Sequence, residues 1–129
     1  MINYLEINNY FDQYQSAFRY SYSTQSALIR ILDDARKSID SGKVVILVSF
    51  DFSKAFDTLN HTLLLYKLRE FGFSDEAIKW VYNYLHSRSQ SVIDQDGNSS
   101  PFLNIALGVP QGSVFGPILF LTYINSNID

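Results

Sequence analysis

The chain has 129 residues, which is enough for one domain or part of one. A hydrophobic fraction of 47% and an aromatic fraction of 16% exclude a disordered chain. The formal charge of −3 argues against a domain that binds nucleic acid through a broadly basic surface, so any contact with a polynucleotide must be local. Cysteine is absent, which excludes disulfides, thiolate metal sites and cysteine nucleophiles.

No targeting or membrane segment is recognisable in the sequence. The longest fully apolar runs, residues 44–48 and 117–121, are too short to cross a bilayer. The N-terminus lacks the basic and apolar regions of a signal peptide. We therefore expect an intracellular protein, in the nucleus or the cytoplasm, with no membrane partner.

The first third of the chain predicts helical structure. Residues 2–8 form a short, weak candidate helix. Ser23 and Thr24 can cap a longer helix that runs to about Ser41, where Gly42 suits a left-handed cap. Apolar residues recur through this stretch at helical spacing: Ala27, Leu28, Ile31, Leu32, Ala35 and Ile39.

A strand is expected next. Val44–Val48 is a continuous apolar run rich in β-branched residues, which is typical of a strand buried on both faces. Asp51 follows at its carboxyl end. This strand is the only one we expect in the first half of the chain.

Two helices are expected in the middle. One spans His61–Phe71 and stops at Gly72. Ser74 caps the other, with acidic residues in its first turn, where the helix dipole favours them. Its expected buried stripe consists of Ile78, Val81, Tyr82 and Leu85. Trp80, on the same helix, is also expected in the core.

The last third predicts a hairpin and a final helix. Residues 91–94 and 102–107 read as two strands joined through Asp96-Gly97, which is a hairpin turn signal. Pro117 suits the first position of a helix over residues 118–125. The whole order predicts a mixed α/β (α+β) fold without a regular βαβ repeat.

Asp51 is the first candidate for chemistry, because a carboxylate at the end of a buried strand stands at the rim of a sheet, where ligand sites gather. Three interpretations are open for it alone: a plain turn aspartate, a Mg²⁺ ligand for phosphoryl or nucleotidyl transfer, or an aspartyl nucleophile. The nucleophile of phosphohydrolases is commonly followed by a second Asp two residues on. Ser53 occupies that position here, and no Gly-rich phosphate loop with Lys is present, which disfavours an unrelated phosphotransferase.

Two sequence motifs favour the interpretation of Asp51 as a Mg²⁺ ligand. Phe-Asp-Phe-Ser-Lys-Ala-Phe-Asp, residues 50–57, resembles the first palm motif of the reverse transcriptases of non-LTR (LINE-type) retrotransposons. Gly-Val-Pro-Gln-Gly-Ser, residues 108–113, resembles the second palm motif of the same enzymes. Their order and separation also fit. The resemblance implies an RNA-directed DNA polymerase that extends a DNA primer on an RNA template with dNTPs.

The resemblance assigns roles to residues of the two motifs. Asp51 would bind both Mg²⁺ ions of a two-metal site, and the main-chain carbonyl of Phe52 would bind one of them. Phe56 would lie under the incoming sugar and reject a 2′-hydroxyl; the alternative is a core Phe. Gln111 and Gly112 would approach the nucleotide and template, the glycine by allowing close backbone approach.

Residues outside the two motifs receive roles as well. Arg19 would contact the triphosphate with its planar guanidinium. Arg88 and Gln90 would touch the template backbone; a solvated helix end is the alternative. Lys54 is as well explained as a surface charge, and Asp57 is expected to cap the following turn.

The implied fold is a partial right-hand polymerase, with fingers at about 1–42 and 58–107 and an incomplete palm at about 43–57 and 108–129. The family's third palm motif, with its Asp-Asp pair, and the thumb are not found before residue 129. We therefore expect a fragment that is inactive by itself, because Asp51 alone cannot hold two Mg²⁺ ions. The alternative is a non-catalytic remnant that binds nucleic acid or protein.

Overall fold

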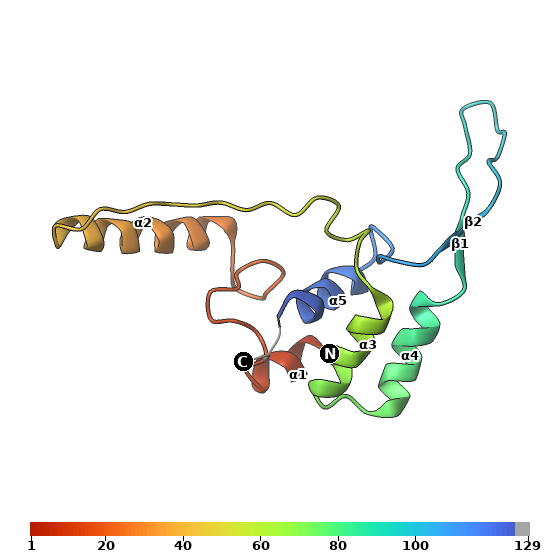
Figure 1. Ribbon diagram of the computed structural model, residues 1–129, viewed down its shortest axis with the longest axis horizontal. Coiled ribbons are helices and arrows are strands. Elements are labelled where there is room, and N and C mark those ends of the chain that lie inside the picture. The colour runs from red at the N-terminus through yellow and green to blue at the C-terminus, as the bar shows by residue number, and fades with distance from the viewer. Residues whose placement is uncertain (126–129) are drawn as a thin grey trace. The chain divides into compact units, whose positions relative to one another are not determined.

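The computed structural model describes residues 1–125, and the chain divides into two units (Figure 1). The larger unit combines Met1–Phe11 with the chain from Lys54 onward, and the smaller unit is Asp12–Ser53. Helices and one two-stranded sheet make up the regular structure of these residues, which confirms a mixed α+β composition. No helix among them is long and apolar enough to span a membrane.

Four helices form the body of the larger unit: α1 (Ile2–Ile7), α3 (His61–Glu70), α4 (Asp75–Leu85) and α5 (Phe115–Ile124). The helix α3 packs against both α4 and α5 (Figure 1). Two apolar clusters hold them together. The first contains Leu59, Leu64, Leu68, Ile78, Val81, Leu85, Val109 and Leu119. The second, around α1, contains Leu5, Phe11, Phe71 and Leu121.

Short polar side chains cap α3 and α4, of which Ser74 is predicted as a cap from the sequence. The Asn60 side chain accepts a hydrogen bond from the Leu63 amide at 3.0 Å, and Ser74 accepts one from Ala77 at 3.3 Å. Each bond satisfies a first-turn N–H that has no partner within the helix. The predicted starts of α3 and α4 are therefore confirmed, and Gly72 follows α3 with φ of +74°.

The last helix begins earlier than predicted. It starts at Phe115 rather than at residue 118, because the Ser113 hydroxyl accepts a hydrogen bond from the Gly116 amide at 3.0 Å. Pro117 still lies in the first turn, where its missing N–H costs nothing. Val114 is the N-cap residue and forms no side-chain cap bond, so the bond from Gly116 goes to the residue before the cap.

The predicted burial of α4 is partly wrong. Ile78, Val81 and Leu85 are buried, as expected. Tyr82, however, is 42% exposed, and Trp80 is 58% exposed instead of lying in the core. The helix buries only the narrow stripe that faces α3, and these two rings lie outside that stripe.

The sheet is an antiparallel hairpin of β1 (Arg88–Gln90) and β2 (Leu103–Ile105), with Arg88 opposite Ile105. The first strand therefore precedes the predicted span 91–94. Serine side chains explain the shift: Ser91 Oγ donates to the Ser100 carbonyl at 2.8 Å, and Ser100 Oγ accepts from the Val92 amide at 3.0 Å. These hydroxyls interrupt the ladder. Pairing continues beyond them, because the Ser100 amide donates to the Val92 carbonyl at 2.8 Å and Ile93 forms an isolated bridge with Ser99.

The hairpin tip is built around Asp94. Its carboxylate accepts hydrogen bonds from the amides of Asp96 and Asn98 and from the Asn98 side chain. These bonds, above all those from Asn98, lower the pKa of Asp94 below its ordinary value. The Asp96-Gly97 turn is where the sequence predicts it, with φ of +86° at Gly97.

The smaller unit contains one helix, α2 (Thr24–Asp40). Its bounds confirm the prediction. Ser23 and Ser26 form a reciprocal capping box at its start, and Gly42 follows its end with φ of +75°. The apolar stripe of α2 is not buried, since no residue of this helix falls in the buried class.

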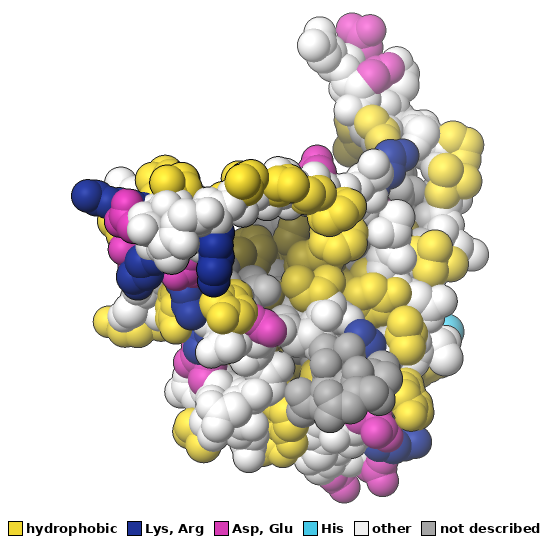
Figure 2. All heavy atoms as spheres, turned by 60° about the vertical axis from the view of Figure 1, so that its left-hand side comes forward, with side chains coloured by type: hydrophobic (Ala, Val, Ile, Leu, Met, Phe, Trp, Pro, Cys, Tyr) yellow, Lys and Arg dark blue, Asp and Glu magenta, His cyan; other side chains and the backbone are white. Residues whose placement is uncertain are grey.

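The strand predicted at Val44–Val48 is wrong. Residues 43–52 form no regular structure, and Val44 is 90% and Ile46 83% exposed. A strand requires a neighbour for its N–H and C=O groups, and no described segment pairs with this one. Hydrophobic side chains are correspondingly prominent on the molecular surface (Figure 2).

Candidate functional site

The end of the first motif and the start of the second lie against each other in the larger unit. The Val109 amide donates to the Phe56 carbonyl at 2.8 Å, and the Gly108 amide donates to the Leu59 carbonyl at 2.7 Å. Gln111 Nε2 donates to Asp57 Oδ1 at 2.8 Å. Three hydrogen bonds thus join segments that are about fifty residues apart along the chain.

Gly108 makes this close approach possible. Its φ is +82°, and a Cβ built there would lie 2.8 Å from Asp57 Cα and from the carbonyl oxygens of Phe56 and Asp57. No other residue type fits without moving backbone. Gly112 differs, because its φ is +78° but the space around it is open.

His61 holds the same loop from the other side. Its Nε2 lies 2.7 Å from the Gly108 carbonyl oxygen. A carbonyl can only accept, so Nε2 carries the proton and donates. The sequence does not indicate this contact, because its partner is 47 positions away and nothing local marks the pair.

Asp57 does not have the role predicted for it. Its carboxylate binds the Gln111 side chain, while the Asn60 side chain caps the helix that follows. The turn itself is closed by main-chain bonds from the Asp57 and Thr58 amides to the Lys54 carbonyl, at 2.9 and 3.1 Å. Lys54 has a left-handed φ of +53°.

A groove of about 810 Å³ opens beside this junction. Its walls come from the 54–58 turn, the end of α4, both strands of the hairpin and the 107–111 loop. Three of the predicted site residues, Arg88, Gln90 and Gln111, line it together. Lys54 and Asp57 complete its charged groups, so two cations face one carboxylate that is already bonded to Gln111.

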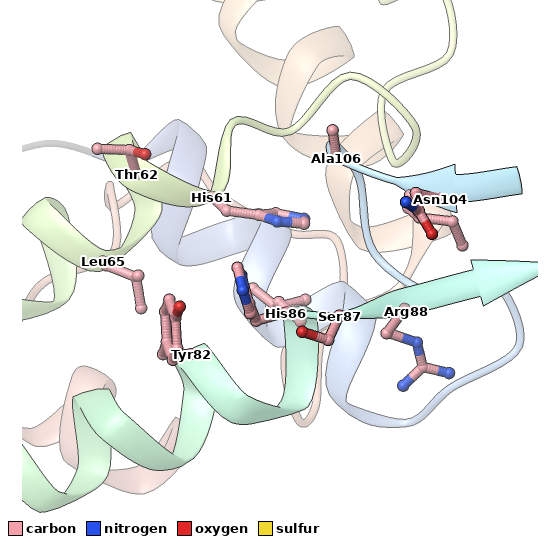
Figure 3. Close-up of a pocket in the computed structure, with 11 residues that line it drawn as sticks. His61, Thr62, Leu65, Tyr82, His86, Ser87, Arg88, Asn104 and Ala106 are labelled. Carbon is pink, nitrogen blue, oxygen red and sulfur yellow. The ribbon is translucent and has the colours of Figure 1, made fainter.

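A second cavity of about 590 Å³ shares a wall with the groove, including Arg88 and Asn104. His61, from the start of α3, and His86, after the end of α4, lie on facing sides of it (Figure 3). The His86 ring stacks on Tyr82, with centroids 4.5 Å apart and planes 18° apart. His61 lines this cavity and also binds the Gly108 carbonyl, so it links the cavity to the 107–111 loop.

Phe56 lies on the inner side of the junction. Its ring is partly buried, packs against the main apolar cluster and lies 4.9 Å from the Phe120 ring, centroid to centroid. This is the placement of a core phenylalanine. The proposed contact with a nucleotide sugar stays a prediction.

The other predicted residues belong to the smaller unit. Asp51 is exposed, and no group of three or more His, Cys, Asp or Glu residues able to hold a metal occurs within residues 1–125. Phe52 is 68% exposed. Arg19 donates to the Gln15 carbonyl at 3.2 Å, and its guanidinium lies 4.6 Å from the centre of the Tyr22 ring. The structure therefore groups the predicted residues in two sets, one in each unit.

Comparison with known proteins identifies the family. The model of the family described as reverse transcriptase (RNA-dependent DNA polymerase) matches residues 1–129. The chain is 32% identical over 111 residues to the RNA-directed DNA polymerase from mobile element jockey of Drosophila melanogaster, covering 86% of the chain and 12% of that protein. It is 28% identical over 123 residues to the probable RNA-directed DNA polymerase from transposon X-element of the same species, covering 95% and 13%.

A further relative of similar identity comes from yeast. The putative COX1/OXI3 intron 2 protein of Saccharomyces cerevisiae is 31% identical over 112 residues, which cover 87% of the chain and 12% of that protein. The chain thus spans about an eighth of the length of the curated relatives named here, 12% to 13%. No solved structure matches it.

These matches agree with the two motifs at residues 50–57 and 108–113. They confirm the resemblance to the reverse transcriptases of non-LTR retrotransposons, at about 30% identity over most of the chain. The family model spans the whole sequence. The chain belongs to the reverse transcriptase (RNA-dependent DNA polymerase) family.

Proposed function

We propose that this chain supplies nucleotide- and template-facing parts of an RNA-directed DNA polymerase that extends a DNA primer on an RNA template. The observation that carries the proposal is the junction of the two motifs beside the groove. Gln111 is fixed there by Asp57, at 2.8 Å, and the loop that bears it is tied to Phe56 through Val109. A loop held in this way presents polar groups to a ligand without a large ordering cost.

The groove would take the nucleic acid. Arg88 and Gln90 on β1 would contact phosphates of the template, which position a strand without reading its sequence. Gln111 and Gly112 would face the incoming dNTP and its template base. The local pair of cations, Lys54 and Arg88, explains how a chain of net charge −3 can still attract a polyanion at this place.

The reverse transcriptase family generally uses divalent metal ions, and we propose Mg²⁺ for this one. Asp51 and the Phe52 carbonyl would be oxygen ligands, the type that Mg²⁺ prefers. One exposed carboxylate is not a complete site, and residues 1–125 bring no acidic cluster to it. Further carboxylates are therefore required, and we propose that this chain alone does not extend primers.

The remaining assignments follow the same family pattern. Arg19 would bind the triphosphate, and Phe56 would exclude a 2′-hydroxyl. In this proposal residues 1–42 and 58–107 belong to the fingers and residues 43–57 and 108–129 to the palm of a right-hand polymerase. The last four palm residues lie outside the described part of the chain. The partial burial of Phe56 supports a rigid placement of its ring.

Binding of a labelled RNA–DNA template–primer, followed by fluorescence anisotropy at several salt concentrations, tests the groove. We expect Arg88→Ala to weaken binding and to lower the salt slope by about one charge. The matched control is Arg69→Ala, because Arg69 also lies in the larger unit but pairs with Asp75 at 3.1 Å, away from the groove. Equal losses in the two variants would refute the groove as the binding site.

Primer extension with Mg²⁺ and dNTPs tests the catalytic part. We expect no extension by this chain. Products that disappear in the Asp51→Asn variant would overturn the proposed need for additional carboxylates. Template–primer binding that depends on Arg88, without extension, is the combination that we expect of this chain alone.

A further inference from the structure

An aromatic surface on α4 is left unexplained by the groove. Trp80 is 58% exposed, and its ring stacks parallel to Tyr84 with centroids 5.8 Å apart and planes 2° apart. Phe115 meets both rings edge-on, at 5.2 and 5.4 Å. Arg88 ends the row, with its guanidinium 5.5 Å from the centre of the Tyr84 ring. We call these four residues the aromatic platform.

The platform is held rigidly. Trp80 and Tyr84 are four residues apart, so they share one face of α4. Arg88 lies beyond the end of the helix, in β1, and its side chain reaches back to Tyr84. Arg88 Nη1 donates to the Tyr84 carbonyl at 3.3 Å, and the edge-on Phe115 ring fixes the tilt of both neighbours. These contacts leave Trp80 58% exposed, so that a flat face of its ring is open to solvent.

The platform continues the groove. Arg88 belongs to both, because it lines the groove and ends the aromatic row. Phe115 follows Gln111 by four residues, and Gln111 also lines the groove. The larger unit therefore presents a polar, cationic groove and, next to it, flat rings edged by a guanidinium.

We propose that the platform stacks an unpaired nucleobase of the strand that lies in the groove, on the exposed face of Trp80. Single-strand binding sites combine such rings with cations, because every base has a flat face and every nucleotide a phosphate. Arg88 supplies the cation at one end. Glu76 lies one helical turn before Trp80 and repels phosphate, so the strand reaches the platform from the Arg88 side. The proposal rests on strand binding in the proposed function.

Trp80 is the only tryptophan of the chain, so its own fluorescence reports the contact. The probes are a single-stranded oligoadenylate RNA of about 12 nucleotides, within the range that such sites cover, and inorganic polyphosphate, which has the charge but no bases. We expect the oligoadenylate to quench Trp80 and polyphosphate to leave its emission unchanged. Equal quenching by both, or none at saturating oligoadenylate, would overturn the proposal.

Substitution gives an independent measurement with end-labelled oligoadenylate and anisotropy. We expect Trp80→Leu to weaken binding about tenfold, the usual cost of one lost base–ring stack, and Trp80→Phe to weaken it less. Tyr66→Leu is the control, since Tyr66 is 55% exposed on α3 and lines neither cavity. Circular dichroism verifies that α4 stays folded in each variant.

The outcomes separate this inference from the proposed function. If Trp80→Leu binds as well as the unmodified chain while Arg88→Ala still weakens binding more than Arg69→Ala, the platform is wrong and the groove stands. If the chain binds no strand at any salt concentration, both proposals fall.

Discussion

Replacing Gly108 by alanine tests whether the two motifs are joined as the structure places them. An L-residue in a left-handed conformation costs roughly 1–2 kcal/mol, and Gly108 has φ of +82°. The added Cβ would also lie 2.8 Å from three backbone atoms of Phe56 and Asp57, which cannot move aside like a flexible side chain. Such overpacking typically adds about 1–3 kcal/mol. We therefore expect Gly108→Ala to lose about 2–5 kcal/mol of unfolding free energy, a large share of the roughly 5–15 kcal/mol of a typical domain.

Gly112→Ala is the matched control. Gly112 has a similar φ of +78° but nothing within 4 Å of its built Cβ, so only the conformational cost of roughly 1–2 kcal/mol applies. Urea unfolding followed by the fluorescence of Trp80 reports the larger unit, which contains both glycines. Equal losses in the two variants would refute the close contact between Gly108 and the first motif.

Three further predictions concern other contacts. Asp57→Ala and Gln111→Ala should each destabilise the larger unit slightly. Their effects on the unfolding free energy should be non-additive by about 0.5–1.5 kcal/mol in a double-mutant cycle measured by urea unfolding. Additive effects would exclude the 2.8 Å hydrogen bond. The pKa of Asp94 is lowered by bonds from Asn98, so the hairpin tip is stabilised above pH 3.8 and loses that support as the pH falls through the lowered pKa. The NMR chemical shift of the Asn98 amide should change at acid pH in the unmodified chain and in the control Asp96→Ala. It should not change in this way in Asp94→Ala. An identical acid response in all three chains would contradict the role of the Asp94 carboxylate. Ile46→Lys should reduce self-association, measured by light scattering, because it places a charge on an unpaired apolar segment where Ile46 is 83% exposed. The unfolding midpoint reported by Trp80 should stay unchanged. Unaltered scattering would count against this segment as the contact between chains.

The parts of the fold that the sequence predicts well are those with local causes. A serine or asparagine three residues before a first-turn amide starts α2, α3 and α4, and a glycine with positive φ follows the first two. The family resemblance is local in the same sense, because each motif is a short contiguous run. Neither kind of signal depends on where the rest of the chain lies.

The candidate site is predicted only in part, because its geometry depends on distant pairs. The resemblance implies that Gln111 and Arg88 lie near one ligand. The two residues line the same groove, which is consistent with this expectation. The bonds from Gln111 to Asp57 and from His61 to the Gly108 carbonyl join positions 54 and 47 residues apart. Composition and spacing carry no information about such pairs. A glycine needed for close contact is likewise indistinguishable in the sequence from one needed only for a turn, as Gly108 and Gly112 illustrate.

The burial errors at Val44–Val48 and at Trp80 have a common physical origin. An apolar side chain gains free energy when it leaves water, but its hydrophobicity does not determine which group will cover it. At Val44–Val48 the unmet requirement is a neighbouring strand, since an extended segment needs main-chain partners as well as apolar contact. At Trp80 the helix is already complete, and only a flat face is left open, which a nucleobase can cover without any main-chain bond. The same apolar signal therefore leaves an unpaired extended segment in the first case and, in the second, the open ring for which we propose a nucleobase partner.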